Sequence, residues 1–264
     1  MKILHPTDFS PASYKALELA QHLRGLLGGS LTVLHVAEPR YASPAQFFSS
    51  ENEKIFQQAD REWHQALAQQ LQGLDPSAQA VLEAGKPIPR ILHHAAEHDL
   101  LVIGTHGEDS LKDRLIGTTA ERVIAQAEKP VAVVGRDTQL RRFSHLLVAT
   151  ALADPSERAL GLAYEIALRS EGNLTLLHVV EPGAVGADPA RLHTLVSYFP
   201  GEARERIRVE VLPSSGPPEE ALLDYAERHG VSALFMGRSR GNRMFGSVTR
   251  SVLNRARVPV FVHP

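Results

Sequence analysis

The sequence predicts an α/β protein built of two doubly wound, five-stranded parallel-sheet domains in tandem. Two observations lead to this fold class. Short apolar runs, typical of strands buried in a parallel sheet, alternate with longer segments of helical periodicity. The same series of elements then occurs a second time along the chain. A length of 264 residues accommodates two domains of ordinary size.

The repeat is clearest in one stretch of each half. Residues 31–39, LTVLHVAEP, recur as residues 174–182, LTLLHVVEP, at an offset of 143 residues. Roughly the first 40 residues of the halves align at this offset without a gap. We therefore expect one domain over residues 1–137 and another over residues 144–264, with a polar boundary at residues 136–144.

Glycines extend the repeat into the later part of each half. Gly104 pairs with Gly237 at an offset of 133, and Gly117 pairs with Gly246 at an offset of 129. The second half therefore has a shorter middle. It also has a glycine-containing loop that is four residues shorter than its counterpart.

The elements of the first half follow from local signals. Ser10 and Pro11 supply an N-cap and an N1 proline for the first helix, which Gly28 and Gly29 end. The expected strands are residues 2–6, 31–36, 80–82, 100–103 and 131–134. The further expected helices are residues 55–67, 88–98 and the run that begins at 118. In a parallel sheet of this kind, ligands bind outside the carboxyl ends of the strands.

The composition excludes several classes of function. Lys and Arg number 28 against 30 Asp and Glu, so the near-neutral chain lacks the field of a general nucleic-acid binder. The chain has no Cys, which excludes disulfides, thiolate metal sites and Cys nucleophiles. There is neither a signal peptide pattern nor an apolar stretch of the roughly 20 residues that span a bilayer. We expect a cytoplasmic, soluble protein with no membrane partner.

A glycine loop is the strongest candidate for a binding site. Residues 104–107, GTHG, follow an apolar strand, and residues 117–119, GTT, open a helix after nine intervening residues. Glycines let backbone N–H groups approach a phosphate, and a helix N-terminus adds unsatisfied donors and a positive dipole. The pattern is neither a Walker A loop nor GxGxxG. A purely structural role for these glycines, as turns and a helix cap, remains the alternative.

In these residues the sequence resembles the universal stress protein family in its tandem form. The family's nucleotide-binding pattern, Gly-x2-Gly-x9-Gly-Ser/Thr, is matched at Gly104, Gly107, Gly117 and Thr118. The opening residues 6–8, PTD, and the strand end 34–36, LHV, also match. The resemblance implies a Rossmann-like fold of the adenine nucleotide alpha hydrolase type. It also implies a role in the stress response and binding of ATP with a divalent cation, which we expect to be Mg²⁺.

The resemblance further implies where the nucleotide lies. Asp8 and the backbone of Val36 would take the adenine, Gly104 the ribose region, and the later glycines and Thr118 the phosphates. The expected nucleotide-binding residues are Pro6, Thr7, Asp8, Val36, Ile103, Gly104, His106, Gly107, Gly117, Thr118 and Thr119. Asp8 also fits an ordinary charge at a helix N-terminus. His106 could polarise a water molecule, although a contact with phosphate or solvent is the simpler interpretation. No catalytic residue and no protein metal ligand is assigned.

The second half departs from this pattern. Ala151 replaces Asp8, Arg240 replaces the second glycine, and the loop is shorter, although Gly246 and Ser247 still open a helix. An anion there could be assisted by Arg238, Arg240 and Arg243. We expect a degenerate partner domain instead. By resemblance, the halves should pair as an intramolecular pseudo-dimer through their last strands, residues 131–134 and 260–262.

Three other features carry weaker signals. Residues 237–241 fit the G-x-S-x-G elbow of hydrolases, which requires an acid and then a His further along the chain. No Asp or Glu follows Arg240, and His263 is the only His that does, so a hydrolase is disfavoured. Residues 94–98 fit H-x-x-E-H, which we interpret as solvent-exposed histidines and not a zinc site. The arginines of residues 238–257 are expected to form a solvated face.

The sequence therefore predicts an ATP-binding regulatory stress protein with the nucleotide in its N-terminal domain. A slow ATPase or phosphotransfer enzyme, and a structural stress protein without a ligand, remain alternatives. The sequence leaves open the preference among ATP, ADP and AMP and whether two chains form a homodimer.

Overall fold

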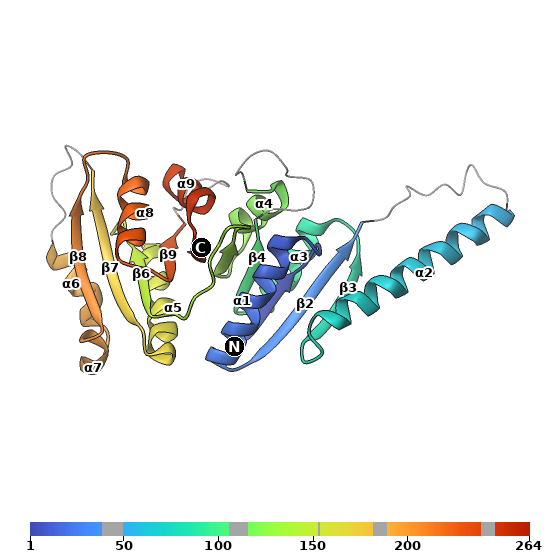
Figure 1. Ribbon diagram of the computed structural model, residues 1–264, viewed down its shortest axis with the longest axis horizontal. Coiled ribbons are helices and arrows are strands. Elements are labelled where there is room, and N and C mark those ends of the chain that lie inside the picture. The colour runs from blue at the N-terminus through green and yellow to red at the C-terminus, as the bar shows by residue number, and fades with distance from the viewer. Residues whose placement is uncertain (39–49, 106–115, 153, 182–188, 239–245) are drawn as a thin grey trace.

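A computed structural model gives the fold of the chain (Figure 1). It describes residues 1–38, 50–105, 116–152, 154–181, 189–238 and 246–264. Among these residues, no helix is long and apolar enough to cross a membrane.

One continuous sheet of ten strands runs through both halves of the molecule. The strands of the first half are β1 (Lys2–Pro6), β2 (Ser30–Ala37), β3 (Gln79–Ala84), β4 (Leu100–Gly104) and β5 (Val131–Val134). Those of the second half are β6 (His145–Ala149), β7 (Asn173–Val180), β8 (Ile207–Pro213), β9 (Ala233–Gly237) and β10 (Val260–His263). Their order is β3-β2-β1-β4-β5-β10-β9-β6-β7-β8, so each half contributes five neighbouring strands, as the sequence predicts.

The halves join through an antiparallel pair at the centre of the sheet. Val260 of β10 lies opposite Val133 of β5, and Phe261 lies opposite Ala132. All other strand pairs are parallel. The pairing of the last strand of each half, which the family resemblance implies, is present in this structure.

Helices cover both faces of the sheet, which the alternation of strand and helix requires. Those of the first half are α1 (Pro11–Leu27), α2 (Ser50–Leu74), α3 (Pro87–Ala96) and α4 (Thr118–Gln126). Those of the second half are α5 (Asp154–Ser170), α6 (Pro189–Ser197), α7 (Gly201–Arg204), α8 (Pro218–Arg228) and α9 (Ser247–Arg255). One buried cluster lies under α1, α2, α5 and α6, and the other under α3, α4, α8 and α9. The clusters include residues of both halves, so the hydrophobic core is continuous across the β5–β10 pair.

The ends of α1 follow the signals in the sequence. The side chain of Ser10 accepts a hydrogen bond from the Ser13 N–H at 3.3 Å, and Gly28 ends the helix with φ +69°. Helix α3 is shorter than residues 88–98, because it ends at Ala96. Helix α2 is 25 residues long and extends past the β3 edge of the sheet (Figure 1), whereas α6, in the corresponding part of the second half, has only nine residues.

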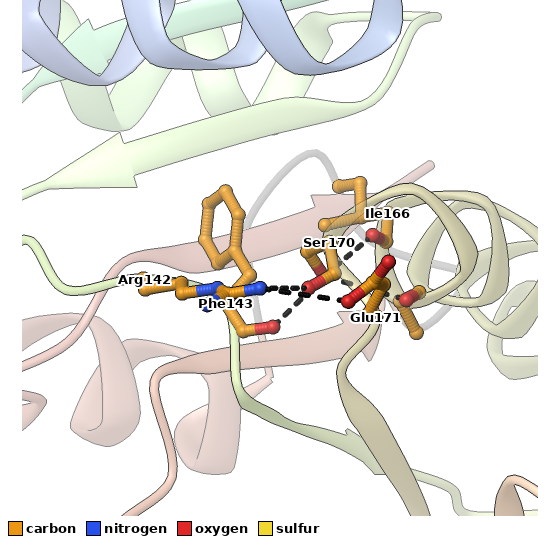
Figure 2. Close-up of polar contacts among 6 residues, drawn as sticks. Arg142, Phe143, Ile166, Ser170 and Glu171 are labelled. Atoms are coloured by element: carbon orange, nitrogen blue, oxygen red, sulfur yellow. Dashed lines mark hydrogen bonds and ion pairs between the residues drawn. The ribbon is translucent and has the colours of Figure 1, made fainter.

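The connection between the halves is less polar than the sequence suggests, because Phe143 is 1% exposed. Its ring lies 5.3 Å from that of His22 in α1 and 6.4 Å from that of Phe261 in β10, measured between ring centroids. Figure 2 shows how the backbone here is held: the Ser170 hydroxyl donates to the carbonyl oxygen of Phe143 at 2.8 Å. A buried aromatic ring therefore links the two halves at this connection.

Candidate functional site

A tight turn follows β1 at the carboxyl edge of the sheet. The Thr7 N–H donates to the Leu34 carbonyl at 2.8 Å, which joins the turn to β2. Phe9 adopts φ +62°, and its N–H donates to Thr7 Oγ1 at 3.1 Å. The Ser10 N–H donates to Asp8 Oδ1 at 3.0 Å, while Asp8 itself is exposed. The turn therefore holds a carboxylate at the edge where a ligand of this fold would bind.

The second half repeats the backbone of this turn without the carboxylate. The Thr150 N–H donates to the Leu177 carbonyl at 2.9 Å, and the Leu152 N–H donates to Thr150 Oγ1 at 2.9 Å. Leu152 has φ +58°, which matches Phe9. Ala151 stands where the first half has Asp8. The two turns therefore share their geometry and differ in their chemistry.

His5 lies beneath the first turn and is fully buried. Its Nδ1 is 2.9 Å from the Val102 carbonyl oxygen, which can only accept, so Nδ1 carries the proton. The Ser13 hydroxyl lies 3.4 Å from His5 Nε2 and donates to Thr7 Oγ1 at 2.8 Å. Burial lowers the pKa of His5 to about 4, although the Val102 hydrogen bond and the charge of Asp8 act in the opposite direction.

This network was not predicted from the sequence, although a signal for it exists. His5 is a polar residue in an apolar strand, and the position 143 residues later is Val148. The network therefore belongs to the first half alone.

Strand β2 brings Val36, an expected nucleotide-binding residue, to the same edge of the sheet. Pro6 lies opposite Leu34, so Val36 extends beyond the end of β1 beside the turn. His35 strengthens this arrangement, because its Nδ1 donates to the Thr7 carbonyl at 2.8 Å.

Gly104 ends β4 against the first turn of α1, directly after the buried Ile103. A Cβ at Gly104 would lie 2.8 Å from the Ala12 carbonyl carbon and 2.9 Å from the Ser13 nitrogen. A glycine is required here for the packing of α1 on β4, whatever its role toward a ligand.

The N-terminus of α4 completes the described part of the glycine pattern. Gly117 is the N-cap, and its N–H donates to the Thr105 carbonyl at 2.5 Å. Helix-internal bonding begins with the Glu121 N–H, which donates to the Gly117 carbonyl at 2.9 Å. The N–H groups of Thr118, Thr119 and the next residue therefore have no acceptor inside the helix. The predicted site residues His106 and Gly107 lie outside the described residues.

The amide of Gly117 is thus engaged within the protein, and the donors that α4 offers to an anion come from its first turn. The described residues of the first-half site are brought together along one edge: the turn after β1 bonds to β2, α1 packs on Gly104, and the residue after Gly104 bonds to Gly117.

Helix α9 starts in the same way as α4. Gly246 is its N-cap, with φ −60° and ψ 157° against −60° and 146° for Gly117. Arg238 follows β9, but it does not point to an anion at α9. Its guanidinium donates to the Ile124 carbonyl at 2.9 Å and to the Ala125 carbonyl. These carbonyls belong to the C-terminal turn of α4, where a cation stabilises a helix.

This contact argues against Arg238 as an anion ligand of the second half, the alternative that the sequence left open. Arg240 and Arg243 lie outside the described residues, as does most of the G-x-S-x-G stretch. Arg250 and Arg255 agree with the expectation of a solvated arginine face, because their side chains are 41% and 48% exposed; each also forms an ion pair, with Glu121 and Glu220 respectively.

The histidines of the H-x-x-E-H stretch are neither solvated nor arranged as a metal pair. His94 Nε2 donates to Glu83 Oε1 at 2.7 Å, and this hydrogen bond lowers the pKa of Glu83. His98 is buried and lies past the end of α3, with Nε2 3.0 Å from Thr32 Oγ1. Across the described residues, no group of three or more His, Asp or Glu side chains is placed to hold a metal ion. The expectation of exposed histidines is therefore wrong.

Comparison with known proteins agrees with the duplicated architecture. The family model described as "Universal stress protein family" matches residues 1–135 and again residues 142–264. A universal stress protein of Synechocystis sp. is 23% identical over 98% of both chains. A single-domain-length relative from Methanocaldococcus jannaschii, universal stress protein MJ0577, is 29% identical over 51% of this chain and 94% of its own.

A solved structure extends the likeness to the whole chain. The crystal structure of a universal stress protein from Archaeoglobus fulgidus is 27% identical, with a TM-score of 0.72 over 99% of this chain and 97% of that one. Two successive matches to the family model, together with a full-length fold of the same kind, show that this chain belongs to the universal stress protein family.

Proposed function

We propose that this chain is an ATP-binding regulatory protein in which residues of an N-terminal domain, 1–137, hold the nucleotide, while the domain over 144–264 is its degenerate partner. One observation carries the proposal. The Asp8 turn, the end of β4 and the open first turn of α4 adjoin one another at one edge of the sheet. The second half has Ala151 in place of the carboxylate.

The chemistry of these groups suits an adenine nucleotide. A carboxylate at Asp8 accepts hydrogen bonds, such as those of the adenine amino group, and the N–H groups of Thr118 and Thr119 donate to phosphate oxygens. A Mg²⁺ ion would be held mainly by phosphate oxygens and water, as Mg²⁺ commonly is, with no dedicated cluster of protein ligands among the described residues. No turnover is required for a regulatory role.

Isothermal titration with MgATP tests the proposal and its location. Gly107→Val should abolish binding, because a branched side chain would fill space that the phosphates need. Gly246→Val is the matched control, since it alters the corresponding glycine pattern of the second half, and it should leave binding intact. If Gly246→Val alone removes binding, the site has been assigned to the wrong half.

Thermal shift and single-turnover assays separate the two alternatives. At 100 times Kd, a ligand should stabilise the fold by about 2.7 kcal/mol. The absence of any shift with MgATP, ADP or AMP would favour a structural stress protein without a ligand. Release of γ-phosphate that is lost in His106→Ala would instead favour a slow ATPase or phosphotransfer enzyme.

A further inference from the structure

Helix α4, which carries the open donors of the first half, is held at three points by residues of the second half. Asn254 accepts a hydrogen bond from the residue two before the helix, Ile116. Arg250 forms an ion pair with Glu121 in the first turn, and Arg238 donates to carbonyls of the last turn. All three lie on α9 or directly after β9, so the central β5–β10 pair brings them to α4.

Asn254 makes the contact nearest to the phosphate donors. The N–H of Ile116, a buried residue, donates to Asn254 Oδ1 at 3.1 Å. The next N–H along the chain, that of Gly117, donates to the Thr105 carbonyl. Two successive amides are therefore fixed, one by each half, directly before the N–H groups of Thr118 and Thr119, which have no acceptor inside the helix. Their direction depends on both anchors.

Arg250 acts on the electrostatics of the same helix end. Glu121 lies at the fourth residue of α4, where its negative charge would oppose an anion bound at the N-terminus. Arg250 forms an ion pair with Glu121. The pair neutralises the only acidic residue in the first turn of α4.

Arg250 and Glu121 occupy equivalent positions of the repeat, so their ion pair joins equivalent positions of α9 and α4, whereas the other two contacts run only from the second half to the first. At the repeat offsets, the first-half counterparts of Asn254 and Arg238 are Ala125 and Thr105. An alanine cannot accept a hydrogen bond through its side chain, and a threonine is too short to reach as an arginine does. The first half therefore lacks the side chains for these two contacts.

We infer that the second half positions the phosphate donors at the N-terminus of α4, with Asn254 as the positioning residue and Arg250 as the charge that neutralises Glu121. This inference rests on the proposed function. A domain that has lost its own carboxylate would then be retained because it fixes the donors of its neighbour.

The test compares Asn254→Ala with the wild-type chain by titration with MgATP and with adenosine, which has no phosphate. Loss of one hydrogen bond predicts about two- to tenfold weaker MgATP binding with adenosine binding unchanged. Amide exchange of Ile116 without nucleotide should also become faster. Arg255→Ala is the matched control on α9, because Arg255 pairs with Glu220 of its own half; it should change neither quantity.

The outcomes distinguish this inference from the proposed function. If the wild-type chain binds no ATP, the proposed function fails and this inference fails with it. If the wild type binds ATP and Asn254→Ala binds it equally tightly, only the inference fails. An equal loss for ATP and adenosine would indicate a general structural role and would also overturn it.

A second pair of variants tests the role of Arg250. Arg250→Ala should weaken MgATP binding about two- to fivefold, the range expected for a partly exposed ion pair. Adding Glu121→Gln should restore the affinity, because the unmasked charge is then absent. If the double variant stays as weak as Arg250→Ala, masking of Glu121 is not what Arg250 does.

Discussion

The buried His5 makes the stability of this protein depend on pH in a way that can be worked from the structure. Its pKa falls from an ordinary value near 6.5 to about 4 because the imidazole is buried. Between these values the unfolded chain binds more protons than the folded one, so stability is full above pH 6.5 and falls as the pH is lowered toward 4. The difference between a pKa of 6.5 and one of about 4 corresponds to roughly 3 kcal/mol at most, of which about 2 kcal/mol is lost at pH 5.

Urea denaturation at pH 8 and pH 5 measures this effect by difference. His5→Gln removes the titrating group, so this variant should lose about 2 kcal/mol less than the wild type between the two pH values. His193→Gln, which alters an exposed histidine of α6, should behave as the wild type does.

A second measurement keeps the prediction testable if His5→Gln does not fold. An NMR titration of the wild-type chain should then show a His5 pKa below 5. Equal losses in the wild type and His5→Gln, or a His5 pKa near 6.5, would refute the reasoning.

Three further substitutions follow from close contacts. Gly104→Val should cost about 1–3 kcal/mol in a urea titration and weaken MgATP binding, because its Cβ would lie within 3 Å of the α1 backbone. Phe143→Ala should cost about 3–5 kcal/mol, since its buried ring contacts both halves, and unchanged stability would mean that the ring is not part of the core. Arg238→Ala should cost about 1.5–3 kcal/mol and accelerate amide exchange in the last turn of α4, whereas Arg238→Lys should cost less because it keeps the positive charge.

The sequence was a good guide wherever a signal is local. The caps of α1 at Ser10 and Gly28, the alternation of strands and helices, and the duplicated order all appear as predicted. It was a poorer guide to polar side chains, since exposure depends on what packs against them. His94 and His98 were expected in solvent, yet one pairs with Glu83 and the other is buried against Thr32.

The candidate site divides in the same way. That Asp8 and the glycine pattern of the first half have no intact copy in the second can be read from the repeat alone. The structure adds that Gly104 is needed to pack α1 and that the Gly117 amide is already bonded.

The sequence by itself determined the two-fold α/β plan and which half carries the glycine pattern, because periodicity, caps and repeats are written in neighbouring residues. Only the tertiary structure decided that Asn254, Arg250 and Arg238 contact α4 and the residue before it in the other half. Residues more than 100 positions apart become neighbours only once β5 and β10 pair, and no local pattern of side chains specifies which donor will then meet which acceptor.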